Sequence, residues 1–210
     1  MIRTAGSERH SDRHWLITAF EPFAGRSLNA SMAVQDEIGR IVAHLEPSPD
    51  GKFCFHFSVL PVEYDRCFEA LMQTVEELKS RGVRLEGILS IGEGDEDFKI
   101  ETQANNLDDV EGFPDNRGVI RENQKIFEDL EEDAEIPLRF PFEAFSRIRT
   151  SKNPGYFICN HLCARMGRQF GSDPGAPWFG FIHVPKTGHG GIFTPDIIAT
   201  LIVNGLKKIG

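Results

Sequence analysis

The sequence has little of what marks a nucleic-acid-binding or membrane protein. Lysine and arginine together number 23 against 32 acidic residues, the formal net charge is −9, and the basic residues form no cluster. Nucleic-acid binding needs a basic surface, so we expect no nucleic-acid partner. No apolar stretch is long enough to span a membrane, so we expect no membrane partner either.

The sequence lacks the cysteine spacing of a metal site. The four cysteines form no CxxC pair and no zinc-type pairing with histidine. Cys159 and Cys163 are one helical turn apart, and His161 lies between them on a different face of the predicted helix. We therefore expect no metal, no cofactor, and reduced thiols in a cytoplasmic protein.

The N-terminal segment lacks the apolar core of a signal peptide. We expect residues 1–13 to be a disordered leader or a remnant of expression, followed by one domain over residues 14–210. A chain of 210 residues with 40% hydrophobic and 26% charged residues has the composition of an ordinary globular protein with a substantial core.

What the sequence does contain is an alternation of apolar strands and amphipathic helices. Residues 105–137 are acidic and irregular, and we expect them to form a long excursion over the surface. The alternation is typical of βαβ units, which predicts an α/β fold with a mostly parallel sheet. The expected strands are 15–20, 53–62, 85–91, 98–104 and 178–184, and the expected helices are 30–45, 64–81, 142–149, 159–170 and 195–208.

Cys159 is the strongest candidate for a nucleophile. It opens the predicted helix 159–170, where the macrodipole and unpaired backbone N–H groups favour a thiolate. The alternative is a small buried hydrophobic residue, which is the commoner role of a free cysteine. The local sequence alone does not decide between these two interpretations.

A cysteine nucleophile needs a base, and the base needs a group that orients it. His183 lies inside the apolar strand 178–184, where an imidazole needs a hydrogen-bond partner. Glu101 follows the glycine-containing loop after strand 85–91. The alternatives are a core histidine bonded to a backbone carbonyl and an exposed strand glutamate. Such residues are expected to meet only if the carboxyl ends of the parallel strands bring them together.

Short blocks spread along the chain resemble a known family. They are residues 16–25 (LITAFEPFAG), 29–31 (NAS), 60–62 (LPV), 100–105 (IETQAN), 114–118 (PDNRG), 155–161 (GYFICNH) and 180–185 (GFIHVP). In this order they resemble the pyroglutamyl peptidase type I (pyrrolidone carboxyl peptidase) family of cysteine peptidases. Together they cover most of residues 15–185.

The resemblance implies both an architecture and a reaction. The architecture is an α/β three-layer sandwich with a mostly parallel central sheet flanked by helices. The reaction is removal of an N-terminal pyroglutamyl residue from a peptide substrate through a thioester acyl-enzyme. Cys159 would be the nucleophile, His183 the general base and then acid, and Glu101 the orienting carboxylate. Members of the family commonly form homo-oligomers, so a homodimer or homotetramer is expected.

The resemblance also implies residues that bind the substrate. Phe20 and Phe23 match the aromatic pair that encloses the lactam ring, although two core phenylalanines are the alternative in a chain with 17 of them. Ile158, directly before the nucleophile, and Glu93, in the glycine-containing loop, are expected to contact the substrate as well.

The chain departs from the family in that loop. The family's block is roughly GQAGGR, whereas residues 92–99 here are GEGDEDFK, so Glu93 replaces the glutamine that helps recognise the lactam. The block's arginine is missing, Thr102 replaces a second arginine, and residues 186–191 replace a glutamine-bearing segment. An ionised Glu93 accepts hydrogen bonds but cannot donate one, and its burial is costly unless the charge is paired.

These departures leave two alternatives to a pyroglutamyl peptidase. One is a related cysteine hydrolase for a different N-terminal group. In that case Glu93, together with Asp95, Glu96 and Asp97, favours a free α-amine. The other is an inactive family member that acts as a binding protein.

Overall fold

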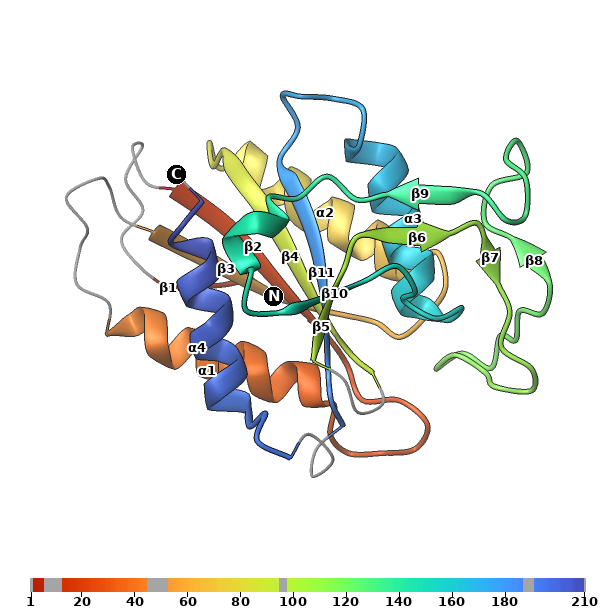
Figure 1. Ribbon diagram of the computed structural model, residues 1–210, viewed down its shortest axis with the longest axis horizontal. Helices are drawn as coiled ribbons and strands as arrows, with labels where there is room; N and C mark the ends of the chain where they lie inside the picture. The colour runs from red at the N-terminus through yellow and green to blue at the C-terminus, as the bar shows by residue number, and fades with distance from the viewer. Residues whose placement is uncertain (1, 6–12, 45–52, 95–97, 187–190, 210) are drawn as a thin grey trace.

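The computed structural model describes residues 2–5, 13–44, 53–94, 98–186 and 191–209 (Figure 1). Its centre is a seven-stranded sheet in the order β1-β3-β2-β4-β11-β5-β10. The strands are β1 (Arg3–Ala5), β3 (Phe53–Leu60), β2 (Arg13–Phe20), β4 (Leu85–Glu93), β11 (Trp178–Val184), β5 (Lys99–Glu101) and β10 (Arg149–Ser151).

The sheet is mostly parallel, as predicted. The β3, β2, β4 and β11 strands are parallel neighbours, and β5 pairs in parallel with β10. Two contacts are antiparallel, β1 with β3 and β5 with β11. The second of these reversals matters for the site, because it brings the end of β5 beside the middle of β11.

Helices cover both faces of the sheet, which confirms the three-layer α/β architecture (Figure 1). Helices α1 (Ala30–Ala43) and α4 (Pro195–Leu206) pack on one face, and α2 (Arg66–Ser80) and α3 (Ile158–Phe170) on the other. The β2 strand is buried on both sides. Its Trp15 and Ile17 belong to the core under α1 and α4, whereas Leu16 and Phe20 belong to the core under α2 and α3.

The described part of the N-terminal segment corrects the prediction of a leader. Residues Arg3–Ala5 form β1, the edge strand that pairs with β3, and Arg13 is already the first residue of β2. Arg3 also donates to Asp36 of α1, so this short segment gains both backbone and side-chain partners. The remaining residues of the predicted leader, 1 and 6–12, lie outside the described residues.

The segment 103–137 is better ordered than its composition suggests. It contains two small antiparallel pairs, β6 (Gln103–Asn105) with β9 (Glu135–Pro137) and β7 (Leu107–Asp108) with β8 (Gln124–Lys125). The predicted strand 98–104 is therefore divided between two sheets. The break falls at Thr102, whose N–H donates to the Ser151 carbonyl of β10 while its own carbonyl accepts from Leu138.

Two further predictions need correction. The expected helix 142–149 is a single 3₁₀ turn, Phe142–Phe145, and is followed by strand β10, which the sequence analysis did not predict. The predicted strand 53–62 ends at Leu60, because Pro61 cannot donate to a strand ladder. Among the described residues, none of the helices has the length and hydropathy needed to cross a membrane.

Candidate active site

The three residues expected to be catalytic come from elements that meet at the carboxyl end of the sheet. Cys159 is the second residue of α3, His183 is the next-to-last residue of β11, and Glu101 is the last residue of β5. The antiparallel register pairs Glu101 with Phe181, two positions before His183, so Glu101 and His183 lie on the same face of the sheet.

His183 and Glu101 are in direct contact. The Nδ1 atom of His183 lies 2.8 Å from Oε1 of Glu101, and both side chains are buried. Burial raises the pKa of the Glu101 carboxyl, but the hydrogen bond and charge of His183 outweigh it, so this pKa is below its usual value. Lys99 Nζ lies 3.3 Å from the same oxygen. Glu101 is therefore an ionised acceptor that fixes the orientation of the imidazole.

The Cys159 thiol occupies space left by a glycine next to His183. Gly92 of β4 pairs with His183 of β11 in the parallel register. A Cβ at Gly92 would lie 2.8 Å from Cys159 Sγ and 2.6 Å from Cζ of Phe181, closer than real Cβ contacts allow. The absence of a side chain at position 92 thus admits the thiol to the part of the sheet that carries the imidazole.

The resting state of the thiol differs from the expectation based on its helix. Burial and the carboxylates of Glu101 and Glu93 raise the pKa of Cys159 to about 12. The first turn of α3 does place Cys159 among N–H groups without intrahelical acceptors. The helix effect on the thiol is nevertheless outweighed, so Cys159 is protonated at neutral pH until a base accepts its proton.

Glu93 is buried and already has partners. Its side chain is 1% exposed, its Oε1 lies 2.5 Å from Nη2 of Arg26, and its Oε2 accepts from the N–H of Ala30 at 2.8 Å. Ala30 is the first residue of α1, whose N-terminus favours a negative charge. The charge that the sequence analysis treats as costly is therefore paired, by an arginine that the motifs did not indicate.

The four residues expected to bind substrate lie in different surroundings. Phe20 is buried against Phe181, with ring centroids 6.3 Å apart, and Ile158 is 1% exposed within the core.

Phe23 instead contacts Phe113 and Phe157, and the Arg26 guanidinium lies 4.7 Å above its ring. Phe23, unlike Phe20, lines an open cleft of about 760 Å³, together with Ala24, Gly25, Arg26, Ser27, Leu28, Phe113 and Lys186.

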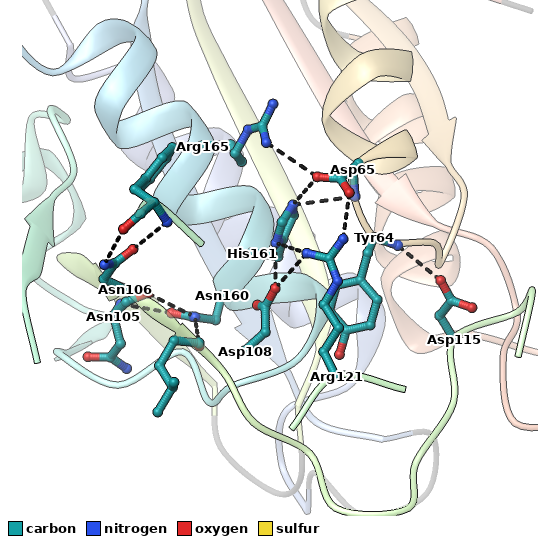
Figure 2. A network of polar contacts seen from close by, with 12 residues as sticks. Tyr64, Asp65, Asn105, Asn106, Asp108, Asp115, Arg121, Asn160, His161 and Arg165 are labelled. Carbon is teal, nitrogen blue, oxygen red and sulfur yellow. Dashed lines mark hydrogen bonds and ion pairs between the residues drawn. The ribbon is translucent and has the colours of Figure 1, made fainter. Parts of the chain in front are cut away.

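The helix that carries Cys159 is joined to the segment 103–137 by a polar network in which Asp108 and His161 are buried (Figure 2). His161 Nδ1 lies 2.8 Å from Oδ2 of Asp108, and His161 Nε2 lies 3.2 Å from Oδ1 of Asp65. Arg121 pairs with both aspartates, at 2.5 Å to Asp65 and 3.0 Å to Asp108. Burial lowers the pKa of His161, but its two aspartates reverse that effect and leave the pKa raised.

Asn160 strengthens the same connection. Its side-chain oxygen accepts from the N–H of Asn105, and its side-chain N–H groups donate to the carbonyls of Asn105 and Leu107 (Figure 2). Phe113 also reaches the aromatic cluster around Phe157. The prediction that residues 105–137 run over the surface is therefore wrong for these residues, because the backbone of Asn105 and Leu107 and the side chains of Asp108 and Phe113 contact the start of α3.

Some predicted features cannot be placed. Asp95, Glu96 and Asp97, which the free-amine alternative invokes, lie outside the described residues, and so do residues 187–190 of the substituted C-terminal segment. No sequence motif indicated Arg26, Asp65, Asp108 or Arg121. The PDNRG block at 114–118 was the one signal near this region. Its Asp115 and Asn116 connect the segment to the loops that follow β3 and β2: Asp115 accepts from the N–H of Tyr64, and Asn116 donates to Glu21.

Comparison with known proteins agrees with this geometry. A family model described as pyroglutamyl peptidase matches residues 13–207. The chain belongs to the pyroglutamyl peptidase family. The pyrrolidone-carboxylate peptidase of Staphylococcus haemolyticus is 26% identical over 182 residues, which cover 81% of this chain and 77% of the relative. That of Chromobacterium violaceum is 28% identical over 184 residues, which cover 81% and 76%.

Solved structures of pyroglutamyl peptidases have the same fold. The pyrrolidone carboxyl peptidase of Thermus thermophilus superposes with a TM-score of 0.68 at 26% identity, covering 93% of this chain and all of that one, 100%. Pyroglutamyl peptidase I of Bacillus amyloliquefaciens superposes with a TM-score of 0.74 at 20% identity, covering 92% and 93%. The chain therefore has the fold of the family over most of its length. The replacement of the family's glutamine by Glu93 occurs within that fold.

Proposed function

We propose that this protein is a cysteine omega-peptidase that removes an N-terminal pyroglutamyl residue from peptides. In this proposal Cys159 is the nucleophile, His183 is the general base and then acid, and Glu101 orients the imidazole. The observation that carries the proposal is the 2.8 Å contact of His183 Nδ1 with Glu101, beside the glycine gap that holds the Cys159 thiol. The membership of the chain in the pyroglutamyl peptidase family supports it.

The raised pKa of Cys159 determines how the first step proceeds. Glu101 accepts from Nδ1–H of His183, which leaves Nε2 to take the thiol proton as the sulfur attacks. The sulfur bonds to the carbonyl carbon that joins the pyroglutamyl ring to the next residue. The resulting imidazolium is stabilised by the Glu101 carboxylate. The free N–H groups of the first turn of α3 stabilise the negative charge that develops on the carbonyl oxygen.

Three proton transfers complete the cycle, the last of them from His183 back to the sulfur. The His183 imidazolium donates its proton to the leaving amine, the C–N bond breaks, and a thioester joins the pyroglutamyl group to Cys159. Water then gives a proton to His183 while its oxygen attacks the thioester carbonyl. The C–S bond breaks, the sulfur regains its proton, and pyroglutamate leaves. Each step uses groups of this chain and water alone.

The surroundings of Glu93 favour a neutral substrate group over a charged one. Each carboxylate oxygen already has one partner, Arg26 or the Ala30 N–H, and each retains a lone pair that can accept from a lactam N–H. A free α-amine would instead compete with Arg26 for the same charge. The free-amine alternative is therefore not favoured. Phe23, at the open cleft, provides an aromatic face for the ring.

The function is tested by the release of a reporter amine from a pyroglutamyl amide and from matched free-amine aminoacyl amides. We expect turnover of the pyroglutamyl amide alone, and loss of turnover in Cys159→Ala. Preferential turnover of the free-amine amide would overturn the proposed substrate. Absence of turnover on both, in a folded protein, would favour the binding-protein alternative.

The reactivity of the thiol gives an independent test. We expect Cys159 to be alkylated faster at neutral pH than the buried Cys67, because His183 can accept the thiol proton. Replacement of His183 by Ala should slow the alkylation of Cys159. A Cys159 that reacts no faster than an ordinary thiol, with or without His183, would contradict the assigned roles.

We further propose that the chain forms a single domain that includes β1, since both cores share one sheet, and that the protein is cytoplasmic and forms a homodimer or homotetramer. None of the four cysteines forms a disulfide, which is consistent with a reducing compartment. The exposed apolar side chains of Leu28 and Ile192 are consistent with a contact between copies. Light scattering of the purified protein measures the oligomeric state, and a monomer would contradict the proposed assembly.

A further inference from the structure

Three potential metal ligands lie together at the opposite end of the strands from Cys159. His14 is the second residue of β2, and Cys54 and His56 are the second and fourth residues of β3. The parallel register pairs His14 with Cys54. Because alternate residues of a strand point to the same side, all three side chains lie on the face covered by α2 and α3.

The ligand atoms of these three residues are close together and buried. His14 Nδ1 lies 3.1 Å from His56 Nε2, and Cys54 Sγ lies 3.9 Å from that same nitrogen. All three ligand atoms are within 4.8 Å of one another. Cys54 and His56 are fully buried, and His14 is 6% exposed. Two imidazoles and one thiol thus converge on one point within the protein.

Two of these three separations match those around a tetrahedral metal ion, and the third, between His14 and Cys54, is no longer than 4.8 Å. With Zn–N bonds of about 2.05 Å and a Zn–S bond of about 2.3 Å, two nitrogens are about 3.3 Å apart, and a nitrogen and a sulfur about 3.6 Å. The observed 3.1 and 3.9 Å differ from these values by only a few tenths of an ångström. Small side-chain adjustments would therefore be enough to accommodate an ion.

The surroundings of the cluster are those of a metal site. Thr4 Oγ1 of β1 lies 3.2 Å from Nδ1 of His56. A hydrogen bond from Nδ1–H to this hydroxyl leaves the Nε2 lone pair directed at the cluster, as outer partners of ligating histidines do. His14 also lines a surface cleft of about 410 Å³ that includes Leu85 and Trp178, which provides a route of entry.

We propose that His14, Cys54 and His56 form a binding site for a divalent transition metal of the zinc type. Binding replaces the thiol proton of Cys54 by the metal, and this proton is released to solvent. The ion links β2 to β3 where both strands begin, and through Thr4 it reinforces the pairing of β1. The site is separate from the proposed chemistry at Cys159, which lies at the other end of the sheet.

Cobalt(II) is the probe that distinguishes this site from a hydrogen-bonded pair of rings beside a thiol. The full chain carrying Cys159→Ala, which removes the thiol near His183, is reduced and titrated with Co²⁺. We expect one equivalent to produce a thiolate-to-cobalt charge-transfer band and the visible absorption of a tetrahedral ion. Zn²⁺ should abolish both and raise the Tm. Absence of these bands would overturn the proposal.

Variants in the Cys159→Ala background assign the ligands. Cys54→Ser should abolish the charge-transfer band, whereas Cys67→Ser, at another fully buried cysteine, should leave it unchanged. Thr4→Val should weaken the binding of Co²⁺ by about tenfold. If Cys54→Ser does not fold, His14→Asn provides the same test with the thiol retained, and should weaken binding at least as much as Thr4→Val. A charge-transfer band that persists without Cys54, or binding unaffected by His14→Asn, would overturn the assignment.

Discussion

Nη2 of Arg26 lies 2.5 Å from Oε1 of Glu93, so the residue that departs from the family's glutamine is paired with a cation of the same chain. The two residues are on different segments, the loop before α1 and the end of β4. Together with the N–H of Ala30, the guanidinium compensates a carboxylate that is almost completely buried. The departure is therefore accommodated within the protein and does not require a charged substrate.

We predict that Glu93 and Arg26 are coupled in stability but not in substrate preference. Glu93→Gln keeps an acceptor for the Ala30 N–H and loses the charge, so its double-mutant cycle with Arg26→Met should give a coupling free energy of about 1 kcal/mol. Urea unfolding measures it. The pyroglutamyl preference should be the same in all four proteins.

The exposed pair of Arg3 and Asp36 is a matched control for that cycle. Each of these side chains is 56% exposed, so their coupling should be close to zero. A Glu93–Arg26 coupling no larger than that of the control would show that the pair does not stabilise the buried carboxylate. A shift toward free-amine substrates in wild type relative to Glu93→Gln would contradict our assignment of the substrate.

A side chain at position 92 should impair catalysis more than folding. In Gly92→Ala the new methyl group must displace Cys159 Sγ or the Phe181 ring, from 2.8 and 2.6 Å respectively. A displacement of this size should lower kcat/KM by about 100-fold. Gly39→Ala in α1 is the control, because its Cβ would meet nothing closer than 3.4 Å and alanine favours a helix. Equal activity in both variants would contradict the proposed place of the thiol.

Two arginine–aspartate pairs should differ strongly in their contribution to stability. Arg121→Met leaves the fully buried Asp108 without its guanidinium partner and should lower the free energy of unfolding by about 3–5 kcal/mol. Arg168→Met removes a pair whose side chains are 45% and 62% exposed, and should leave the free energy of unfolding almost unchanged. Chemical denaturation measures both losses. Similar losses would show that the network around His161 contributes no more than a surface pair.

Stability should fall as the pH rises above about 9. Burial raises the pKa of Cys67, of Cys163 and of the Tyr64 hydroxyl above their ordinary values in the folded protein. The unfolded chain then loses these protons first and binds fewer of them, so the free energy of unfolding decreases with pH. Each group contributes up to about 1.4 kcal/mol per pH unit above its unfolded pKa.

Urea unfolding at a series of pH values between 8 and about 10.5 measures this slope. In Cys67→Ala the slope should be smaller by the contribution of one group, although the cavity also lowers the absolute stability. The comparison of slopes separates the two effects. A stability that is constant or increases across this range would contradict the protonated state assigned to the buried thiols.

The features that the sequence predicted correctly are those carried by local patterns. The strands around Trp15 and Phe181 and the helix that begins near Cys159 follow from periodicity, and the family blocks indicated the His183–Glu101 pair. The division of strand 98–104 at Thr102 was not predictable, because it depends on a hydrogen bond to β10, a strand 49 positions away that has no distinct pattern of its own.

Longer-range polar contacts were missed for the same reason. Arg121 is 40 positions from His161 and 56 from Asp65, and no spacing rule connects such residues. The state of the Cys159 thiol is a related case. The helix N-terminus is visible in the sequence, but the burial and the Glu93 and Glu101 carboxylates that outweigh it come from tertiary packing.

The proposed nucleophile lies on a helix, whereas its base and orienting carboxylate lie on adjacent strands of the sheet. A small slide of α3 over the sheet would change the distance from sulfur to imidazole and leave the 2.8 Å contact between His183 and Glu101 intact. Activity therefore depends on how the helix layer is aligned with the sheet, whereas the His183–Glu101 contact depends on the sheet alone. A variant in which only the position of α3 changes can therefore lose turnover and still keep the sheet and the His183–Glu101 pair unchanged.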